Sequence, residues 1–370
     1  MNVLIISPEE WSAHTVSKHH YAMTLARRRA TVFFLNPPDD SLKRMKIEQV
    51  EGLPDLHIVS ASKVATGLRI YPAFLRRWLE RRWLLRLESI IGTKIDVVWL
   101  FENSRFFDMR FAGERLKIYH QVDQSQAFHL ELAASTADIC FCVTDFIKEL
   151  LNPFNSKVYK IPHGLAAALN PIELTVDQLG KFEQDVPQIV YIGNLDMLFL
   201  DAELLTGIVR QFSNVQFHFV GGYSKDGLLR QLAGDLPNVC WWGRVESALI
   251  PAILDQADIL LVTYRAAQYR EQLANSHKII EYLGSGKTIV ATYTDEYKDK
   301  RDLLEMVDDS CDYVAVFERV VKNLPDYNST ERQAQRMAFA QANTYDKQIN
   351  KIITLLKQHR LIDDTNMKTL

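Results

Sequence analysis

Cysteine is scarce in this sequence, which holds only four among its 370 residues: Cys140, Cys142, Cys240 and Cys311. There is no Cys-x-x-Cys pair, and no histidine stands at metal-ligand spacing from a cysteine. The pattern excludes a disulfide framework and a cysteine-based metal site. Cys140 and Cys142 flank Phe141 in an apolar run, so both lie on one face of an expected strand. We expect buried thiols in a reducing cytosol.

Long hydrophobic runs and an excess of one charge are also missing. No apolar run approaches the roughly 20 residues that a membrane span requires. The apolar start, residues 1–7, lacks a basic leader and a small-residue cleavage site, so we interpret it as a first strand and not an export signal. Lys and Arg number 43 against 46 Asp and Glu, a net charge of −3. This balance argues against a global nucleic-acid footprint.

The composition that is present is typical of a globular protein. Hydrophobic residues make up 47% and charged residues 24%, with only 15 Gly and 12 Pro, which excludes collagenous and disordered chains. At about 100–200 residues per domain, the length predicts two or three domains.

Short apolar runs alternate with helical patterns along the whole chain. Strands are predicted at Val3–Ser7, Thr31–Leu35, Leu56–Ser60, Asp96–Phe101, Leu116–His120, Ile139–Val143, Val158–Ile161, Gln188–Ile192, Val215–Val220, Val239–Trp242, Asp258–Val262, Thr288–Thr292 and Tyr313–Val316. Because most of these runs lack polar alternation, we expect parallel sheets covered by helices on both faces. Residues 166–187 interrupt this alternation, because they contain no strand pattern. We therefore predict an α/β protein with a domain at 1–165, a linker at 166–187 and a domain at 188–344.

The segment Gly284–Thr288 looks like the end of a phosphate-binding P-loop. Glu281 stands where that motif needs its first glycine. A P-loop also runs from strand to helix, whereas here a helix precedes the strand. We therefore interpret Gly284 and Gly286 as the C-terminal cap of a helix.

The stretch before that cap carries the most information. A polar loop, residues 263–275, follows the strand Asp258–Val262 and contains Arg265 and Arg270. Ser276 is a good N-cap for the next helix, whose free amides suit a phosphate or diphosphate. Lys278 adds a cation in the first turn, and Glu281, one turn on, can accept hydrogen bonds from two vicinal hydroxyls. The alternative is an ordinary capped helix with a solvated Lys and Glu.

At this point the sequence resembles a family. Residues 276–292, with Lys278, Glu281, Tyr282 and Leu283 ahead of a Gly-Lys-Thr-Ile-Val strand, resemble the donor-site helix of GT-B-fold glycosyltransferases. The nearest resemblance is to family 4, also called group 1, of bacterial surface-polysaccharide synthesis. Further similar segments lie at Tyr191–Asn194, Pro237–Arg244, Ala257–Ile259, Ala137–Ile139, Ile161–Gly164 and Thr344–Asp346.

The resemblance implies two Rossmann-like domains that face each other across a cleft, with the C-terminal helix, residues 345–370, packing back on the first domain. It implies that the second domain binds a nucleotide-sugar donor, with Glu281 on the ribose and Lys278 on the diphosphate. The residues implied in donor binding are Glu281, Lys278, Ser276, His277, Asn275, Gly193, Asn194, Arg265 and Arg270. The family's usual first glutamate would fall at Leu273, and its usual Arg–Lys pair is replaced after Gly193 by Asn194, Leu195 and Asp196. Arg265, Arg270 or Lys225 would then assist Lys278.

Asp-x-Asp occurs nowhere in the chain, so a metal-clamped diphosphate is not supported. We predict no metal, and no cofactor beyond the nucleotide sugar.

Polar residues at strand ends of the first half are candidates for the acceptor side. His14 follows the first strand and Asp123 follows the strand Leu116–His120, and either can act as a catalytic base. Glu102 and His163 are candidate acceptor contacts. The alternatives are a capping histidine, a turn aspartate and structural side chains.

Residues 70–91 form a basic amphipathic pattern with tryptophan. Such a helix can lie on an anionic bilayer, or it can cover the core while its arginine stems extend to solvent.

We therefore predict a glycosyltransferase, hexosyltransferase-like and retaining, that moves a sugar from a nucleotide-diphosphate donor to a saccharide or lipid-linked acceptor. Its expected place is the cytoplasm, at the inner face of the membrane and in cell-surface polysaccharide synthesis. The rival functions are a nucleotide-sugar epimerase or hydrolase on the same fold, and a non-catalytic nucleotide-binding protein.

Overall fold

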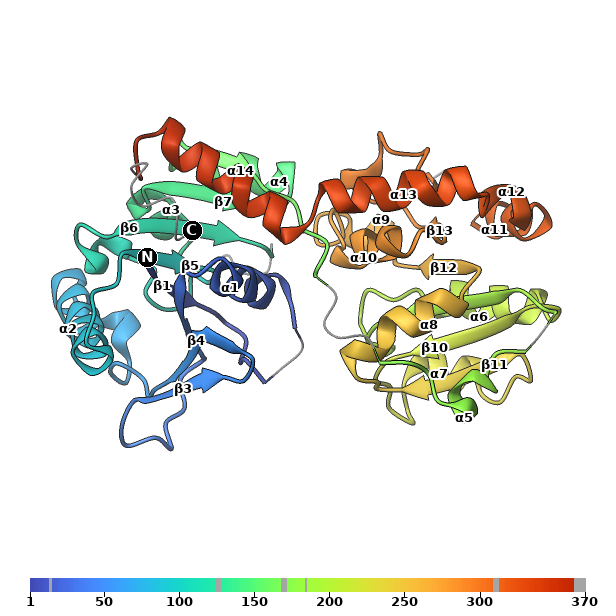
Figure 1. The fold of residues 1–370 in the computed structure, drawn as a ribbon, viewed down its shortest axis with the longest axis horizontal. Coiled ribbons are helices and arrows are strands. Elements are labelled where there is room, and N and C mark those ends of the chain that lie inside the picture. Colours follow the sequence, from blue (N-terminus) through green and yellow to red (C-terminus); the bar gives the residue numbers. More distant parts are fainter. Residues whose placement is uncertain (13–14, 124–127, 168–171, 184, 309–312, 363–370) are drawn as a thin grey trace. The chain divides into compact units, whose positions relative to one another are not determined.

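The structure is a computed structural model, and it describes residues 1–12, 15–123, 128–167, 172–183, 185–308 and 313–362. Its contacts divide the chain into two units. The first unit comprises Met1–Gly164 and Tyr345–Leu370, and the second comprises Leu165–Thr344. Each unit is a mostly parallel sheet with helices around it, as Figure 1 shows. The predicted α/β class is confirmed.

The first unit is built on an eight-stranded sheet in the order β3-β4-β2-β1-β5-β6-β7-β8. Every neighbouring pair is parallel except β3 and β4. Strand β1 lies between β2 and β5, so the chain changes direction across the sheet at this strand. The strands are β1 (Asn2–Ile6), β2 (Thr31–Leu35), β3 (Lys46–Val50), β4 (Leu53–Ser60), β5 (Val97–Leu100), β6 (Leu116–Gln121), β7 (Ile139–Cys142) and β8 (Val158–Lys160).

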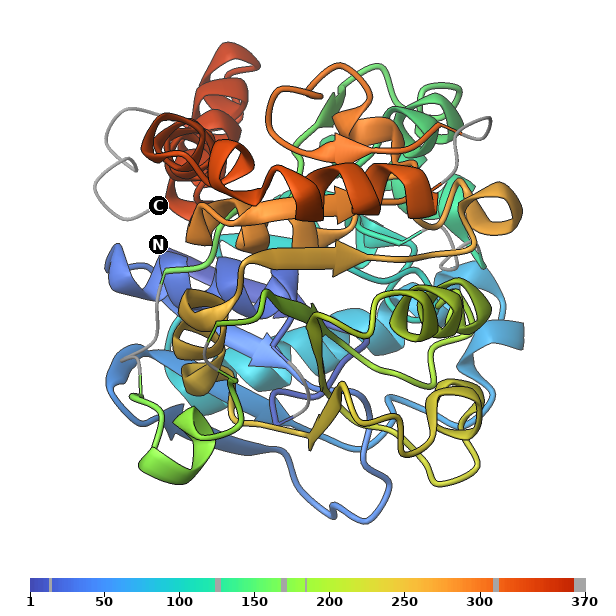
Figure 2. The same cartoon turned by 90° about the vertical axis from the view of Figure 1, so that its right-hand side faces the viewer.

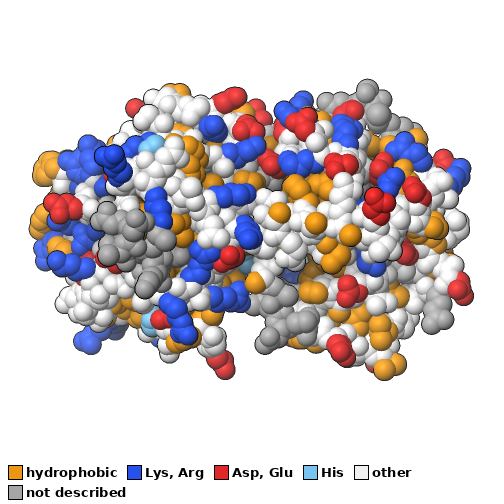
Figure 3. Space-filling model, turned by 45° about the horizontal axis from the view of Figure 1, so that its top comes forward, with side chains coloured by type: hydrophobic (Ala, Val, Ile, Leu, Met, Phe, Trp, Pro, Cys, Tyr) orange, Lys and Arg blue, Asp and Glu red, His pale blue; other side chains and the backbone are white. Residues whose placement is uncertain are grey.

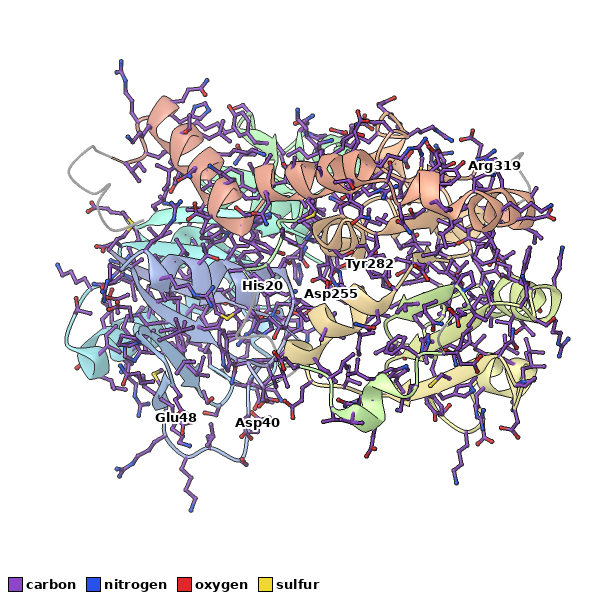
Figure 4. All side chains as sticks on the ribbon, turned by 45° about the vertical axis from the view of Figure 1, so that its right-hand side comes forward. His20, Asp40, Glu48, Asp255, Tyr282 and Arg319 are labelled. Carbon is purple, nitrogen blue, oxygen red and sulfur yellow. The ribbon has the colours of Figure 1, made fainter. Side chains whose placement is uncertain are left out.

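Helices pack on this sheet, and the C-terminal helix α14 is one of them. The α-helices are α1 (Ser17–Arg27), α2 (Ala73–Ile91), α3 (Leu130–Thr136), α4 (Asp145–Leu151) and α14 (Tyr345–Gln358), with 3-10 turns η1 (Leu68–Ile70) and η2 (Met109–Ala112). Tyr345 stacks on His20 of α1, labelled in Figure 4, with ring centroids 4.9 Å apart. Arg28 pairs with Asp346 at 2.7 Å. These contacts hold the last helix in the first unit.

The second unit has a six-stranded, wholly parallel sheet in the order β11-β10-β9-β12-β13-β14. Strands β10, β12 and β13 are buried throughout and mostly apolar, as a parallel sheet covered on both faces requires. The strands are β9 (Gln188–Ile192), β10 (Gln216–Val220), β11 (Val239–Gly243), β12 (Ile259–Val262), β13 (Thr288–Ala291) and β14 (Glu305–Met306).

Helix α10 of the second unit packs against β13 of the sheet and against helices α8 and α13. The helices are α5 (Val176–Leu179), α6 (Ala202–Gln211), α7 (Leu228–Ala233), α8 (Ile250–Gln256), α9 (Ala266–Tyr269), α10 (His277–Ser285), α11 (Tyr313–Lys322), α12 (Leu324–Tyr327) and α13 (Thr330–Ala342), with 3-10 turns η3 (Ser247–Leu249) and η4 (Asp295–Tyr297). Gly286 caps α10 in the left-handed conformation, as predicted, whereas Gly284 lies inside the helix. Arg336 of α13 donates to the Gly286 carbonyl at 2.9 Å, and Figures 1 and 2 show α13 beside α10.

Several local predictions differ from the structure, among them the loop 263–275, which contains α9, and the short strand β14, which was not predicted. The predicted strand Tyr313–Val316 is the start of α11, because Tyr313, Phe317 and Val320 are buried together at helical spacing. The strand β3 was not predicted, since its sequence is polar and mostly exposed. The described part of the predicted linker packs within the second unit, where Phe182 lies 4.3 Å from His218 between ring centroids.

Candidate functional site

The candidate site lies at the carboxyl edge of the second unit's sheet, where β9 ends in a glycine turn. The Gly193 amide donates to the Val220 carbonyl at 2.8 Å, and the Leu195 amide donates to Gly222 at 3.0 Å. A Cβ on Gly221, whose φ is +143°, would lie 1.8 Å from the Gly193 carbonyl oxygen. Only glycine permits the two chain segments to approach so closely.

Lys278 of α10 extends beneath this turn. Its Nζ lies 3.9 Å from the centroid of the Tyr191 ring and 5.2 Å from that of Tyr264. A Cβ on Gly193 would be 2.8 Å from the same atom. The side chain is buried, and within the described residues Nζ has no hydrogen-bond acceptor. A buried ammonium among tyrosine side chains has lost most of its hydration without gaining an anion.

Of the tyrosines around Lys278, Tyr264 responds to its charge. Burial alone would raise the pKa of the Tyr264 phenol, but the neighbouring Lys278 ammonium holds that pKa below its usual value. Burial keeps the pKa of Tyr191 well above its usual value. Tyr282, labelled in Figure 4, accepts a hydrogen bond from the Ile192 amide at 2.9 Å and so ties α10 to the end of β9. The cluster fixes the lysine at the glycine turn.

The start of α10 adds a helix dipole beside the ammonium. Ser276 is the N-cap, and its side chain accepts no first-turn amide. The exposed His277 and the half-buried Asn275 flank it. Glu281 is half-buried one turn along. Lys278, the N-terminus of α10 and the glycine turn thus lie together, and the combination suits an anionic group.

The two predicted loop arginines differ in their surroundings. Arg270 pairs with Asp295 at 3.1 Å and lies over the Tyr293 ring at 4.6 Å from its centroid. Arg265 is half-buried and lines a cavity of about 470 Å³ at the ends of β12 and β13. The charge of Arg270 is therefore already balanced.

Arg244 is a further cation near the glycine turns, and it is not among the residues predicted from the sequence. It follows β11, and a Cβ on Gly222 would lie 2.8 Å from its Nε. It thus stands beside the turns that follow β9 and β10. Its place directly after a strand was the signal that could have identified it.

Leu273 occupies the position where the resembled family carries its first glutamate. It is buried in the hydrophobic core of the second unit. Its carbonyl accepts a hydrogen bond from the Thr294 hydroxyl at 3.0 Å. The position serves packing in this chain.

In the first unit, Glu102 follows β5, and its buried carboxylate is bound to neighbouring side chains. It accepts a hydrogen bond from the Ser104 hydroxyl at 2.5 Å and forms an ion pair with Arg105. Arg105 also donates to the Ser7 carbonyl at 2.6 Å. The carboxylate thereby joins the ends of β5 and β1.

Two further predicted acceptor-side residues, Asp123 and His163, lie within the described part of the first unit. Asp123 is exposed just after β6, and its backbone carbonyl accepts a hydrogen bond from the Gln121 side-chain Nε2 at 3.1 Å. His163 is half-buried near the end of the first unit's main segment. His14 lies outside the described residues.

A cavity of about 690 Å³ opens at the carboxyl ends of β1, β2, β4 and β5. Its walls are mainly apolar, with Leu35, Trp83 and Phe106 among them, and Glu102 and Arg105 line it too. It lies where the strand order reverses, the usual place for a ligand in an open parallel sheet.

Comparisons with known proteins place this geometry in a class. Residues 186–323 match the model of the family described as Glycosyl transferases group 1. A sucrose-phosphate synthase from Thermosynechococcus elongatus has a similar structure, with a TM-score of 0.72, 13% identity and coverage of 97% of this chain and 99% of that one. The search of curated proteins finds no matching sequence.

Two other solved structures are similar over nearly their whole length. WaaG, a glycosyltransferase involved in lipopolysaccharide biosynthesis, has a TM-score of 0.60 at 12% identity, covering 98% of this chain and 100% of that one. Anabaena HepE in complex with UDP and glucose has a TM-score of 0.68 at 13% identity, covering 97% and 100%. The chain has the GT-B fold, and the resemblance to group 1 glycosyltransferases is confirmed.

Proposed function

We propose that the protein is a glycosyltransferase that moves a sugar from a nucleotide-diphosphate donor to a saccharide or lipid-linked acceptor. The observation that carries the proposal is the buried Lys278 ammonium, which lies beneath the Gly193 turn beside the start of α10. A diphosphate supplies the anion that this ammonium lacks. The group 1 match over residues 186–323 supports the same assignment.

In the proposed mechanism, the second unit binds the donor. Lys278 and the amides at Ser276 and His277 oppose the charge that grows on the leaving diphosphate. Gly193 and Asn194 allow close approach, Asn275 flanks the phosphate, and Glu281 accepts hydrogen bonds from the ribose hydroxyls. Arg265 supplies a second cation, and Arg244 is our addition to this set. No metal is needed in this scheme, and the absence of Asp-x-Asp supports that part of the proposal.

The first unit binds the acceptor in the proposed mechanism. Its cavity of about 690 Å³ offers apolar walls with Glu102 at the edge. Asp123 and His14 are the proposed base candidates, and His163 a further contact. The proposed outcome is retention of anomeric configuration, as the family 4 resemblance implies.

The proposed setting is the inner face of the cytoplasmic membrane, in cell-surface polysaccharide synthesis. In the described part of the chain, no helix is long and apolar enough to span a membrane. WaaG, which has a similar fold, is involved in lipopolysaccharide biosynthesis, and this supports the polysaccharide part of the proposal.

A second candidate is a non-catalytic nucleotide-binding protein. The buried Leu273, at the position of the family's sugar-facing glutamate, is the observation that favours it. Both candidates require the same donor site, and only one requires turnover.

A nucleotide-sugar panel tests both candidates. Stabilisation against heat by one of UDP-, GDP-, TDP- or ADP-sugars identifies the donor, since a ligand of the native state raises the melting temperature. Product analysis with that donor, with and without acceptor saccharides, then separates transfer from hydrolysis, epimerisation and binding alone. If no nucleotide sugar shifts the melting temperature, the donor-site assignment is wrong.

A further inference from the structure

The first unit turns a row of large apolar side chains toward solvent. Phe74, Trp78 and Leu85 of α2 are about half exposed or more, and Ile70 of the preceding turn is 88% exposed. Positions 74, 78 and 85 are four and seven residues apart, so they share one helix face. We use the name α2 surface for these four residues together with Arg69, Arg81, Arg82 and Arg86.

The arginines of α2 divide into two sets. Arg76 and Arg77 point to the buried Asp108, with N–O distances of 3.6 and 3.3 Å. None of the four arginines of the α2 surface has a carboxylate within 4.0 Å in the described residues. Figure 3 shows Lys and Arg side chains mixed with hydrophobic ones at the left end of the molecule, where Figure 1 places α2. The outward face is therefore both apolar and cationic.

Several apolar side chains gathered on one face require a partner, whereas single ones do not. A second copy of the chain is disfavoured, because a two-fold contact would oppose four unpaired arginines to the same four. An anionic lipid surface satisfies both properties at once. Apolar side chains enter the boundary of headgroups and acyl chains while arginines meet the phosphates.

We propose that the first unit binds an anionic bilayer through the α2 surface, with α2 lying in the plane of the interface. At 19 residues the helix is about 28 Å long. Arg69 and Ile70 also line the first unit's cavity, so an acceptor held there lies next to the lipid. The proposal deepens the proposed function by naming its membrane contact. Vesicle binding is measured without sugar transfer, so the membrane proposal and the proposed function can each fail independently.

Sedimentation of the full-length chain with vesicles tests the charge requirement. We expect binding to phosphatidylcholine vesicles that contain phosphatidylglycerol, weakening as salt rises, and little binding to phosphatidylcholine alone. The triple variant Arg81→Gln, Arg82→Gln, Arg86→Gln should bind about a hundredfold more weakly, at about fivefold per basic residue. The control variant Lys43→Gln, Arg44→Gln, Lys298→Gln removes the same charge from exposed positions outside α2 and should lose far less.

Vesicles that carry brominated acyl chains test insertion. Trp78 is the most exposed of the six tryptophans, so its fluorescence should be quenched on binding. In Trp78→Phe, whose fold is checked by thermal unfolding, that quenching should disappear while binding persists. Equal binding by the α2 triple variant and its control, or unchanged quenching in Trp78→Phe, overturns the proposal. So does a concentration-dependent dimer that Trp78→Phe or the arginine variant dissolves, because it makes a second copy the occupant.

Discussion

Buried charges at the carboxyl edges of the two sheets differ: the one in the first unit has an ionic partner and the one in the second unit has none in the described residues. In the first unit, Glu102 and Arg105 neutralise each other and join two strand ends. In the second unit, the Lys278 ammonium is buried against Tyr191 and Tyr264 without an acceptor in the described residues. A paired charge serves the fold, whereas an unpaired buried charge is a cost that a ligand can remove. This difference fits our proposal of an anionic donor on the second unit and a less charged acceptor on the first.

The largest expected effect comes from Lys278→Met, which removes the charge and keeps most of the volume. We expect transfer to fall by about 10²–10³-fold, as for the loss of one transition-state contact. Thermal stability should stay equal or rise, because an apolar side chain replaces an uncompensated buried ion. Steady-state kinetics and calorimetry on the same preparation measure both quantities. A variant that unfolds more easily and still transfers normally would show that Lys278 is structural.

Gly221→Ala should break the glycine turn of the second unit. Its Cβ would meet the Gly193 carbonyl oxygen at 1.8 Å in a backbone conformation that L residues rarely adopt. We expect a loss of about 3 kcal/mol in the free energy of unfolding. Gly207→Ala is the matched control, because its Cβ meets nothing within 4 Å inside α6 and should stabilise by about 0.5–1 kcal/mol. Equal melting temperatures for the two variants would contradict the close approach.

Glu102→Gln should reveal the structural role of the first unit's ion pair. Removing one partner leaves the Arg105 guanidinium without its anion, and we expect a loss of about 2 kcal/mol in unfolding free energy, reduced because Arg105 is partly exposed. Urea unfolding measures it. Stability equal to that of the native chain, together with a large loss of transfer, would assign Glu102 to the acceptor and not to the fold.

Glu80 gives the first unit a pH dependence of known sign. Burial raises the pKa of this carboxyl to about 8. The folded chain thus holds a proton that the unfolded chain releases above about pH 4.5. Stability should therefore fall as pH rises from about 5 to 8. Glu80→Gln should remove that slope and be more stable than the native chain at pH 8 by about 1–3 kcal/mol. Denaturant unfolding of the native chain and of Glu80→Gln at pH 5 and pH 8 measures this. The prediction is wrong if the two proteins differ in unfolding free energy by the same amount at both pH values.

The smallest expected effect is that of Arg270→Gln. Its charge is balanced by Asp295 on an exposed surface, so we expect the donor KM to change by less than about threefold. Arg244→Gln is the comparison, because Arg244 stands beside the Gly222 turn. A larger effect for Arg270 than for Arg244 would reverse our ranking of the two cations.

Much of the fold followed from the sequence, because buried parallel strands have a strong local signature. The strands β2 and β9 have the predicted bounds. The error at Tyr313–Val316 arose because four apolar residues suit strand and helix alike, and only the burial of Phe317 and Val320 decides for the helix.

The donor-site prediction reached Lys278 and Glu281 through one local segment. The contact of Lys278 with the Gly193 turn joins positions 85 residues apart, and the aromatic support from Tyr191 and Tyr264 comes from two strand ends. Arg244 approaches Gly222 only once β10 and β11 pair. Such contacts cannot be predicted from the spacing of residues along the chain, because they depend on the order of strands in the sheet.

Direct titration of nucleoside diphosphates into the full-length chain and into Lys278→Met tests the central claim most directly. The account predicts that at least one of UDP, GDP, TDP and ADP binds the native chain. It predicts binding about 100-fold weaker in the variant, as the loss of a charge-assisted contact worth about 3 kcal/mol implies. Equal affinity in the two proteins, or no binding of any diphosphate to the native chain, would contradict it.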